Sequence, residues 1–362
     1  MELTKIDTNF ASVGADGLEL DWYSSHDSRF SVHGVYYDEK FGLYRRLSDE
    51  VALASNPNIL SLIKMTAGGR LRFVTDSKNL TIKAVLPGFK PMPHMPITGS
   101  HGFGLYADGV FCNRFSPVFK DFSHLTGNDA FGESLCFEEK KVISSTSQKR
   151  LMELYFPLYG GVRELWIGLD AGSVVERAPA YKYQKPMLFY GSSITQGGCV
   201  SRPGNDYIAI LSRRLNADYI NLGFSGSGNG EDAMIEYITS VDASLYAFDY
   251  NMYANKKDRV LPPHYSIYER IRKAHPEAGI FMYDKPGCDY EPYPEREKLI
   301  YESYLKAKET GDNHVYYLSP WELFGEGDRD ACMVDVSHPN DFGAWRMAYA
   351  MYPIVKQALE YK

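Results

Sequence analysis

The spacing of apolar residues changes near residue 183, and this change divides the chain into two parts that must fold differently. Before it, polar and apolar residues alternate in short runs separated by turn residues, as in Arg70–Thr75 and Leu80–Leu86. Such alternation predicts half-buried β-strands, and turns at this spacing are typical of an all-β sandwich. We therefore expect a β-sandwich of the jelly-roll kind over residues 1–178.

After residue 183, short apolar runs alternate with segments of helical periodicity. We expect strands at 187–190, 218–222, 245–248, 279–283 and 314–318, and helices at 207–215, 232–241, 265–274, 295–309 and 342–360. Strands that alternate with helices predict βαβ units and a parallel, doubly wound sheet. We place this α/β domain, flavodoxin-like in architecture, at residues 179–362, after the polar linker 176–180.

Charge and cysteine content narrow the classes of function. The chain has 39 Lys and Arg against 46 Asp and Glu, a net charge of −7, and its basic residues occur in short groups. A nucleic-acid-binding protein needs a basic face, so we expect no nucleic-acid partner. No apolar run approaches the about 18 residues that span a bilayer, so we expect no membrane partner. Five widely spaced cysteines and an N-terminus without a signal-peptide pattern favour a cytoplasmic location.

Small and polar residues gather where the predicted parallel strands end. Gly191–Thr195 follows the first strand, Asn221–Gly230 the second and Asp249–Asn255 the third, whereas Asp335–Asp341 precedes the last helix. Doubly wound sheets bind their ligands beyond the carboxyl ends of the strands. These four segments are therefore where we expect the chemistry of the protein.

The same segments hold the parts of a serine-nucleophile mechanism. A serine hydroxyl needs a base to take its proton, and an imidazole base works best when a carboxylate fixes its tautomer. Asp335 and His338 lie three residues apart on one loop and can form such a pair. A serine at a strand-to-helix turn has backbone N–H groups beside it that can hold an oxyanion, and Gly226 would let a second N–H approach.

These blocks resemble those of the SGNH (GDSL-like) hydrolases, a family named after a Ser, a Gly, an Asn and a His. Phe189–Thr195 is similar to the first block, with Ser192 in place of the usual Asp. The resemblance implies that Ser193 is the nucleophile. Similarity of Asn221–Gly226 to the second block and of Asp335–Pro339 to the last implies three further roles: an oxyanion-binding N–H at Gly226, a base at His338 and its partner carboxylate at Asp335.

The third block departs from the family pattern. The position of the expected Asn falls on Tyr253, with Asn251 and Asn255 two residues to either side. We assign the oxyanion-hole role to Asn251, which leaves the predicted strand two residues after Asp249. Asn255, or no side chain at all, is the alternative.

The first half resembles the β-sandwich that precedes some SGNH domains, because Gly102–Tyr106 is similar to a Gly-x-Asp-Leu-Tyr signature, with Gly104 where Asp is usual. This domain order resembles two-domain carbohydrate esterases. The resemblance implies a serine esterase that removes O-acetyl groups from plant-derived manno- or xylo-oligosaccharides, with no cofactor. Two alternatives stay open: a lipid or thioester acylhydrolase of the same fold, and a carbohydrate-binding protein with a vestigial hydrolase domain. The oligomeric state is not predicted.

Histidines and aromatic residues outside these blocks carry weaker signals. His94 and His101 flank a turn, but no carboxylate or thiol lies near them at zinc-site spacing, so we predict no metal site. Several aromatic side chains near the predicted site could stack on a sugar ring, although ordinary packing explains each at least as well: Tyr250, Tyr253, Tyr290, Tyr293 and Trp345.

Overall fold

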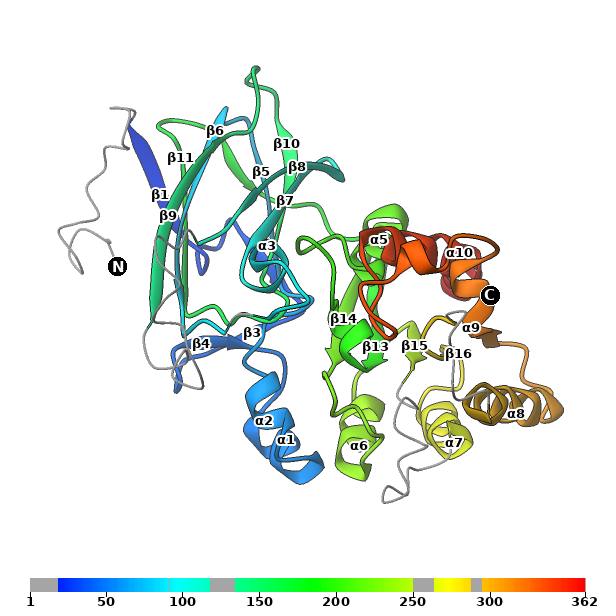
Figure 1. The fold of residues 1–362 in the computed structure, drawn as a ribbon. Coiled ribbons are helices and arrows are strands. Elements are labelled where there is room, and N and C mark those ends of the chain that lie inside the picture. The colour runs from blue at the N-terminus through cyan, green and yellow to red at the C-terminus, as the bar shows by residue number, and fades with distance from the viewer. Residues whose placement is uncertain (1–18, 91, 118–133, 250–263, 288–294, 362) are drawn as a thin grey trace.

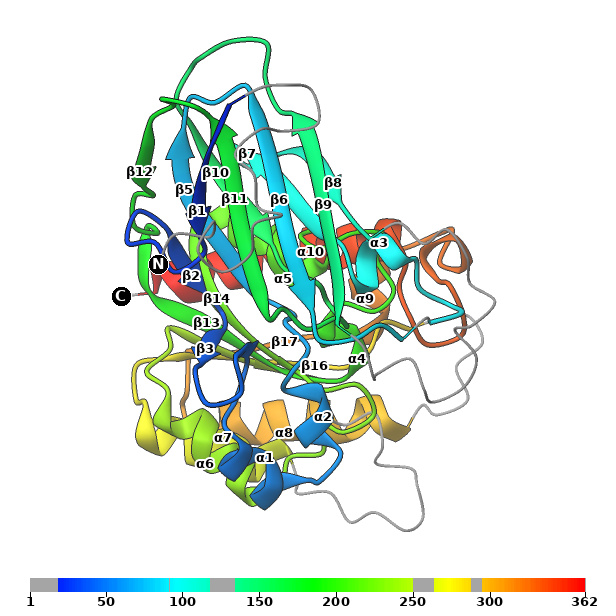
Figure 2. The same cartoon turned by 90° about the vertical axis from the view of Figure 1, so that its left-hand side faces the viewer.

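Two antiparallel sheets packed face to face form the first half of the protein (Figures 1 and 2). The computed structural model describes residues 19–90, 92–117, 134–249, 264–287 and 295–361. One sheet has the order β1 (Leu20–Ser24), β11 (Glu164–Asp170), β6 (Asn79–Leu86), β9 (Leu135–Val142). The other has the order β12 (Val175–Arg177), β5 (Arg70–Thr75), β10 (Arg150–Tyr155), β7 (Phe103–Ala107), β8 (Val110–Phe115), and β2 (Ser31–His33) also pairs with β5.

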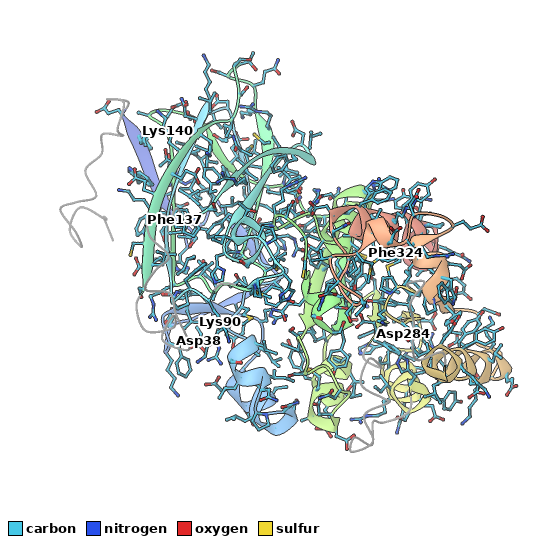
Figure 3. All side chains as sticks on the ribbon, in the orientation of Figure 1. Asp38, Lys90, Phe137, Lys140, Asp284 and Phe324 are labelled. Carbon is cyan, nitrogen blue, oxygen red and sulfur yellow. The ribbon has the colours of Figure 1, made fainter. Side chains whose placement is uncertain are left out.

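The core between these sheets is formed by the side chains that alternate positions along each strand direct inward. Phe73 of β5 and Ile82 of β6 are fully buried and belong to one apolar cluster that takes residues from both sheets. Figure 3 shows side chains filling the space between the two layers. A hairpin and three short helices complete the first half: β3 (Tyr36–Asp38), β4 (Leu43–Arg45), α1 (Asp49–Ser55), α2 (Ile59–Leu62) and α3 (Ile97–Ser100). The predicted antiparallel β domain is confirmed.

The second half contains a five-stranded parallel sheet. Its order is β14 (Ala217–Gly223), β13 (Tyr183–Gly191), β15 (Leu245–Phe248), β16 (Gly279–Tyr283), β17 (Val315–Leu318). The strand sequence 2-1-3-4-5 is that of a flavodoxin-like doubly wound sheet. Because β13 is buried on both faces from Met187 to Gly191, it reads as a continuous apolar run. The predicted α/β architecture is confirmed.

Helices cover both faces of the parallel sheet. One apolar cluster joins it to α5 (Tyr207–Leu215), α9 (Pro320–Phe324) and α10 (Asp341–Glu360). A second cluster joins the other face to α6 (Asp232–Ser240), α7 (His264–Ala274) and α8 (Glu295–Glu309). This second cluster also includes Ala52 of α1 and Ile59 of α2, so two helices of the first half extend a helical layer of the second half (Figure 2).

The predicted linker begins too early. Glu176 and Arg177 lie in β12, where they pair with Val74 and Phe73 of β5. Polar side chains fit there because β12 is an edge strand that exposes one side to solvent. The connection between the halves is therefore the segment 178–182, which contains the predicted boundary between residues 178 and 179.

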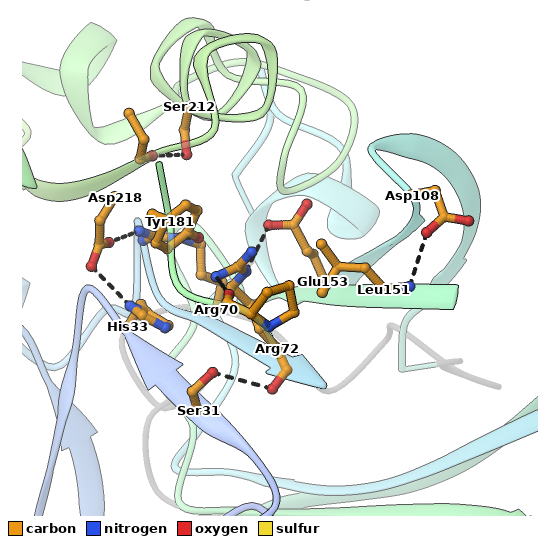
Figure 4. A network of polar contacts seen from close by, with 12 residues as sticks. Ser31, His33, Arg70, Arg72, Asp108, Leu151, Glu153, Tyr181, Ser212 and Asp218 are labelled. Atoms are coloured by element: carbon orange, nitrogen blue, oxygen red, sulfur yellow. Dashed lines mark hydrogen bonds and ion pairs between the residues drawn. The ribbon is translucent and has the colours of Figure 1, made fainter. Parts of the chain in front are cut away.

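A buried group of charges joins the two halves (Figure 4). The guanidinium of Arg70, fully buried on β5, contacts the carboxylate of Asp218 on β14 and donates to the Tyr181 hydroxyl at 2.8 Å. His33 Nδ1 lies 2.8 Å from the second oxygen of Asp218. Burial opposes ionisation of Asp218, but the hydrogen bond from His33 and the charge of Arg70 outweigh it and lower the pKa of that carboxyl. Within the described ranges, no helix is long and apolar enough to cross a membrane.

Candidate active site

Ser193 is the first residue of α4 (Ser193–Gln196), the short helix that follows β13. The side chain of Ser192 caps this helix by accepting from the Ile194 amide at 3.2 Å. A Cβ atom at Gly191 would overlap the carboxylate of Asp249, so only glycine fits at the end of this strand. The turn therefore holds Ser193 at the carboxyl edge of the parallel sheet, where the residue is 5% exposed.

The structure brings Ser193, His338 and Asp335 together in a hydrogen-bonded series. Ser193 Oγ lies 2.9 Å from His338 Nε2, and His338 Nδ1 lies 2.9 Å from Asp335 Oδ2. Asp335 Oδ1 also accepts from the backbone amides of Ser337 and His338 at 2.7 and 2.8 Å. Burial raises the pKa of Asp335, but these hydrogen bonds outweigh it and the pKa is lowered. An ionised Asp335 keeps the proton of His338 on Nδ1 and leaves the Nε2 lone pair for the serine hydroxyl.

The loop after β14 lies against α4 and carries Gly226. The amide of Ser225 donates to Gln196 Oε1 at 3.0 Å, and Asn221 Nδ2 donates to the Thr195 carbonyl at 2.7 Å. Gly226 is exposed and has φ +69°, a conformation that favours glycine. The Ser193 amide is one of the first N–H groups of α4, which have no partner within the helix.

The third predicted oxyanion donor lies outside the described residues. Asn251, its alternative Asn255 and Tyr253 all belong to the segment 250–263, as does Tyr250, and Tyr290 and Tyr293 belong to 288–294. The assignment of Asn251 therefore stays a prediction. Trp345 lies on the surface of α10, where its ring stacks on Tyr349 with centroids 5.4 Å apart.

Asp249 is a buried acid at this site, and no role was predicted for it from the sequence. It follows β15 and accepts from the Ser192 amide at 2.9 Å and from the Ser192 hydroxyl at 3.2 Å. Complete burial raises the pKa of Asp249 to about 7. An acid directly after a buried strand, next to a block whose usual Asp is a serine, was the available signal in the sequence.

Residues of the first half contact the segment that carries Ser193 and the neighbouring loop. The Tyr159 hydroxyl donates to the Ser193 carbonyl at 3.2 Å, and Gln196 Nε2 donates to the Leu158 carbonyl at 3.2 Å. Arg46 donates to the Gly223 carbonyl at 2.5 Å from a fully buried position, where burial lowers its pKa to about 9. These partners are far apart in the sequence, so no local pattern could have revealed them.

The two histidines considered as metal ligands lie in different surroundings. His101 is buried against Phe89, with ring centroids 4.6 Å apart, and burial lowers its pKa to about 4. His94 is exposed and lies beside His338, with ring centroids 5.4 Å apart and the planes tilted by 42°. His94 and His101 therefore do not form a pair of metal ligands. His94 places a segment of the first half next to the candidate site.

Comparison with known proteins assigns both halves. Residues 184–356 match the GDSL-like lipase/acylhydrolase family, and residues 20–175 match the N-terminal domain of SGNH-hydrolase-type esterases. The fold and these matches define the class of the protein as a hydrolase or esterase of the SGNH type. Within that class, the second half is a GDSL-like lipase/acylhydrolase domain and the first half is the N-terminal domain that accompanies it.

Solved structures share this two-part fold. A protein from Bacteroides ovatus named as a GDSL-like lipase is 22% identical with a TM-score of 0.78, over 95% of this chain and 99% of that one. The salicylyl-acyltransferase SsfX3 of a tetracycline biosynthetic pathway is 19% identical with a TM-score of 0.72, over 93% and 97%. A family two carbohydrate esterase from Cellvibrio japonicus is 11% identical with a TM-score of 0.57, over 94% and 98%. No curated protein matches the sequence.

Proposed function

We propose that the protein is a serine esterase that removes O-acetyl groups from carbohydrates, with acetylated manno- or xylo-oligosaccharides as its substrates. The observation that carries this proposal is the hydrogen-bonded series of Ser193, His338 and Asp335 at the carboxyl edge of the parallel sheet. A serine, an imidazole and a carboxylate in this order are the parts of a nucleophilic acyl-transfer site.

Each side chain has one task in the proposed reaction. Ser193 Oγ attacks the acetyl carbonyl carbon while its proton passes to His338 Nε2, and Asp335 stabilises the imidazolium that forms. The amides of Ser193 and Gly226, together with the side chain of Asn251, donate to the oxyanion. The ester C–O bond then breaks as His338 protonates the departing sugar oxygen. A water molecule activated by His338 finally releases acetate from Ser193.

Exposure of the base supports a bulky leaving group. The side chain of His338 is 20% exposed and that of Asp335 is 41% exposed, so the side of the site that protonates the leaving group faces solvent. A sugar chain can occupy such an open side, whereas the small acetyl group needs little space beside Ser193. Among the solved structures of this fold are family two carbohydrate esterases, which supports a carbohydrate substrate by analogy of fold.

The state of the cysteines supports a reducing location for this activity. The four cysteines within the described ranges, at positions 112, 136, 199 and 332, are free thiols. Thiols that stay reduced are usual in the cytoplasm. We propose a cytoplasmic location on this basis, which would limit substrates to short oligosaccharides that enter the cell.

Mass spectrometry of acetylated manno- and xylo-oligosaccharides tests the proposed function. The wild-type protein and a Ser225→Ala control should remove acetyl units one at a time, and Ser193→Ala should leave the substrates unchanged. Ser225 is a matched control because it lies on the neighbouring loop, tied to α4 through its amide and not through its side chain.

Two other results would replace the carbohydrate proposal. The family match names lipases and acylhydrolases, so a panel of longer-chain esters and thioesters is assayed in parallel. Cleavage of those alone, with acetylated sugars untouched, would establish an acylhydrolase. Binding of oligosaccharides without turnover of any ester would establish a vestigial hydrolase that serves as a binding protein.

A further inference from the structure

Two residues that the proposed reaction does not use lie beside His338. They are His94, from the first half, and Cys199, from the loop after α4. One nitrogen of each histidine and the Cys199 sulfur all lie within 4.8 Å of one another. We call these three side chains the His–Cys–His cluster.

Packing fixes the two backbone segments that carry His94 and Cys199. Met92 and Met95 pair across the turn that presents His94, and the buried side chain of Met95 packs in one apolar cluster with Cys199 and Val200. The Cys199 amide donates to the Pro339 carbonyl at 3.0 Å, next to His338. The three ligand atoms therefore lie close together because segments from both halves of the protein pack against each other there.

Two imidazole nitrogens and one thiolate sulfur are ligands that zinc prefers. Zinc binds nitrogen at about 2.0–2.1 Å and sulfur at about 2.3 Å in tetrahedral geometry, which places ligand atoms about 3.3–3.6 Å apart. The three ligand atoms already lie within 4.8 Å of one another, so small side-chain rotations bring the cluster to this spacing. The Nδ1 atom of His338 faces Asp335, so Nε2 is the nitrogen that it can offer to a metal.

We propose that the His–Cys–His cluster binds a zinc ion that switches the esterase off. On binding, the Cys199 thiol releases its proton to solvent, both imidazoles bind as neutral ligands, and water occupies the fourth position. The zinc ion takes the Nε2 lone pair that the Ser193 hydroxyl needs, so His338 can no longer act as a base. The proposed zinc site depends only on the geometry of the His–Cys–His cluster, whereas the proposed inhibition also rests on the proposed esterase function.

Titration calorimetry of the metal-free full-length protein with zinc chloride tests the site without any activity assay. The wild type should bind one zinc ion, and His94→Ala and Cys199→Ser should each weaken binding at least tenfold. His26→Ala and Cys136→Ser are the controls and should bind as the wild type does, because both residues are exposed and would capture zinc if any accessible ligand sufficed. Equal affinity of the wild type, His94→Ala and Cys199→Ser would overturn the site.

Cobalt substitution identifies the sulfur ligand by a separate signal. Co²⁺ bound to the wild type should show a thiolate-to-metal charge-transfer band that His26→Ala and Cys136→Ser keep and Cys199→Ser lacks. Retention of this band in Cys199→Ser would also overturn the site.

Ester hydrolysis with and without zinc then tests the inhibition. Zinc should inhibit the wild type reversibly, with activity restored by a chelator. His94→Ala should keep the basal rate within about twofold of wild type and need at least tenfold more zinc for half-inhibition. Full activity of a wild-type enzyme with zinc bound would overturn the switch. A protein that binds zinc as expected but cleaves no ester would contradict the proposed function and leave the site supported by calorimetry.

Discussion

At the scale of single residues, the carboxyl group of Asp249 contacts Ser192, the residue before the proposed nucleophile. It accepts hydrogen bonds from both the amide and the hydroxyl of Ser192, the residue that caps α4. Burial raises its pKa from 3.8 to about 7 because water no longer solvates the charge. Asp249 is therefore a positioning residue for the nucleophile turn, and its charge changes in the neutral pH range.

Replacing Asp249 by Asn should remove a pH dependence of stability. Between pH 3.8 and about 7 the folded protein holds the Asp249 proton more tightly than the unfolded chain does. The contribution of this group to the free energy of unfolding thus falls as pH rises through that interval and is constant above it. Asn keeps the size and does not ionise, so the stability of Asp249→Asn relative to wild type should rise by up to about 1.4 kcal/mol per pH unit. Urea unfolding at pH 5, 6, 7 and 8 measures the difference in free energy of unfolding between the variant and the wild type. A difference that does not change with pH would contradict a raised pKa of Asp249.

The family resemblance and the order of the motifs predicted that Ser193, His338 and Asp335 would meet, and the structure brings them within hydrogen-bond distance; their catalytic roles stay a prediction. Each lies in a short local motif, and parallel strands bring their carboxyl ends to one edge whatever the details of packing. Asp249 and Tyr159 were not predicted to contact the nucleophile turn, because both contacts are made across a long separation in sequence. Tyr159 carries no local signal of such a partner, whereas the signal at Asp249 was its place directly after a buried strand.

At the scale of elements, the start of α10 anchors the loop that carries His338, the proposed base. Asn340 caps this helix, because its Oδ1 accepts from the amides of Phe342 and Gly343 at 3.0 and 3.1 Å. The backbone amide of Asn340 donates to the Cys332 carbonyl at 2.9 Å. His338 lies only two residues before this cap, so the helix start fixes the base relative to the sheet.

Removing the cap should lower both stability and activity. Asn340→Ala should lower the free energy of unfolding by about 1 kcal/mol and reduce kcat, because the loop of Asp335 and His338 loses its anchor. Asn340→Asp keeps an oxygen for both amides but loses the hydrogen bond from Asn340 Nδ2 to the Ala331 carbonyl at 2.7 Å, so it should lose less stability and less activity than the Ala variant. Thermal unfolding and ester hydrolysis measure the two effects. Equal behaviour of the Ala and Asp variants would show that the cap has no such role.

Helices and strands of the second half were predicted closely. Helix 207–215 and strands 245–248 and 279–283 match α5, β15 and β16, because strands buried on both faces and amphipathic helices have distinct apolar patterns. β13 begins at Tyr183, four residues before the predicted start, since its polar first residues lie where the sheet is still exposed. The short helix α9 was missed because five residues are too few to show a period.

At the scale of the whole molecule, the two halves form one structure with a charged interface. Arg70 of the first half is fully buried and is balanced by Asp218 of the second half, with His33 on the other carboxylate oxygen (Figure 4). Apolar contacts extend the same interface, since α1 and α2 pack into the cluster of α6 and α7. The first domain therefore packs against the second as a structural wall, and it also places His94 beside the His338 ring.

Asp218→Asn should destabilise the protein strongly, because it leaves the charge of Arg70 buried without a counter-charge. Breaking a buried ion pair in this way costs about 3–5 kcal/mol. The matched control is Asp232→Asn, since Asp232 is 88% exposed in its ion pair with Arg270 and should change stability by less than about 1 kcal/mol. Urea unfolding at pH 7 compares the two variants, and similar losses in both would contradict a special role for the interface.

This interface could not be predicted from the sequence. The sandwich and the parallel sheet each follow from local periodicity, but Arg70 and Asp218 are separated by 148 positions and each looks like an ordinary surface charge. The same holds for Arg46, whose partners Asn221 and Gly223 lie in the other half. Contacts between domains depend on the shapes of two folded surfaces. Residue order alone does not reveal these shapes.

Covalent labelling with a fluorophosphonate tests most directly whether Ser193 is an activated nucleophile, because it needs no knowledge of the substrate. The reagent bonds to an activated serine Oγ with loss of fluoride, and mass spectrometry of peptides locates the adduct. We expect one adduct on Ser193 in the wild type and in Ser225→Ala, much slower labelling in His338→Ala, and none in Ser193→Ala. An adduct that persists in Ser193→Ala, or that maps to another serine, would contradict the central claim.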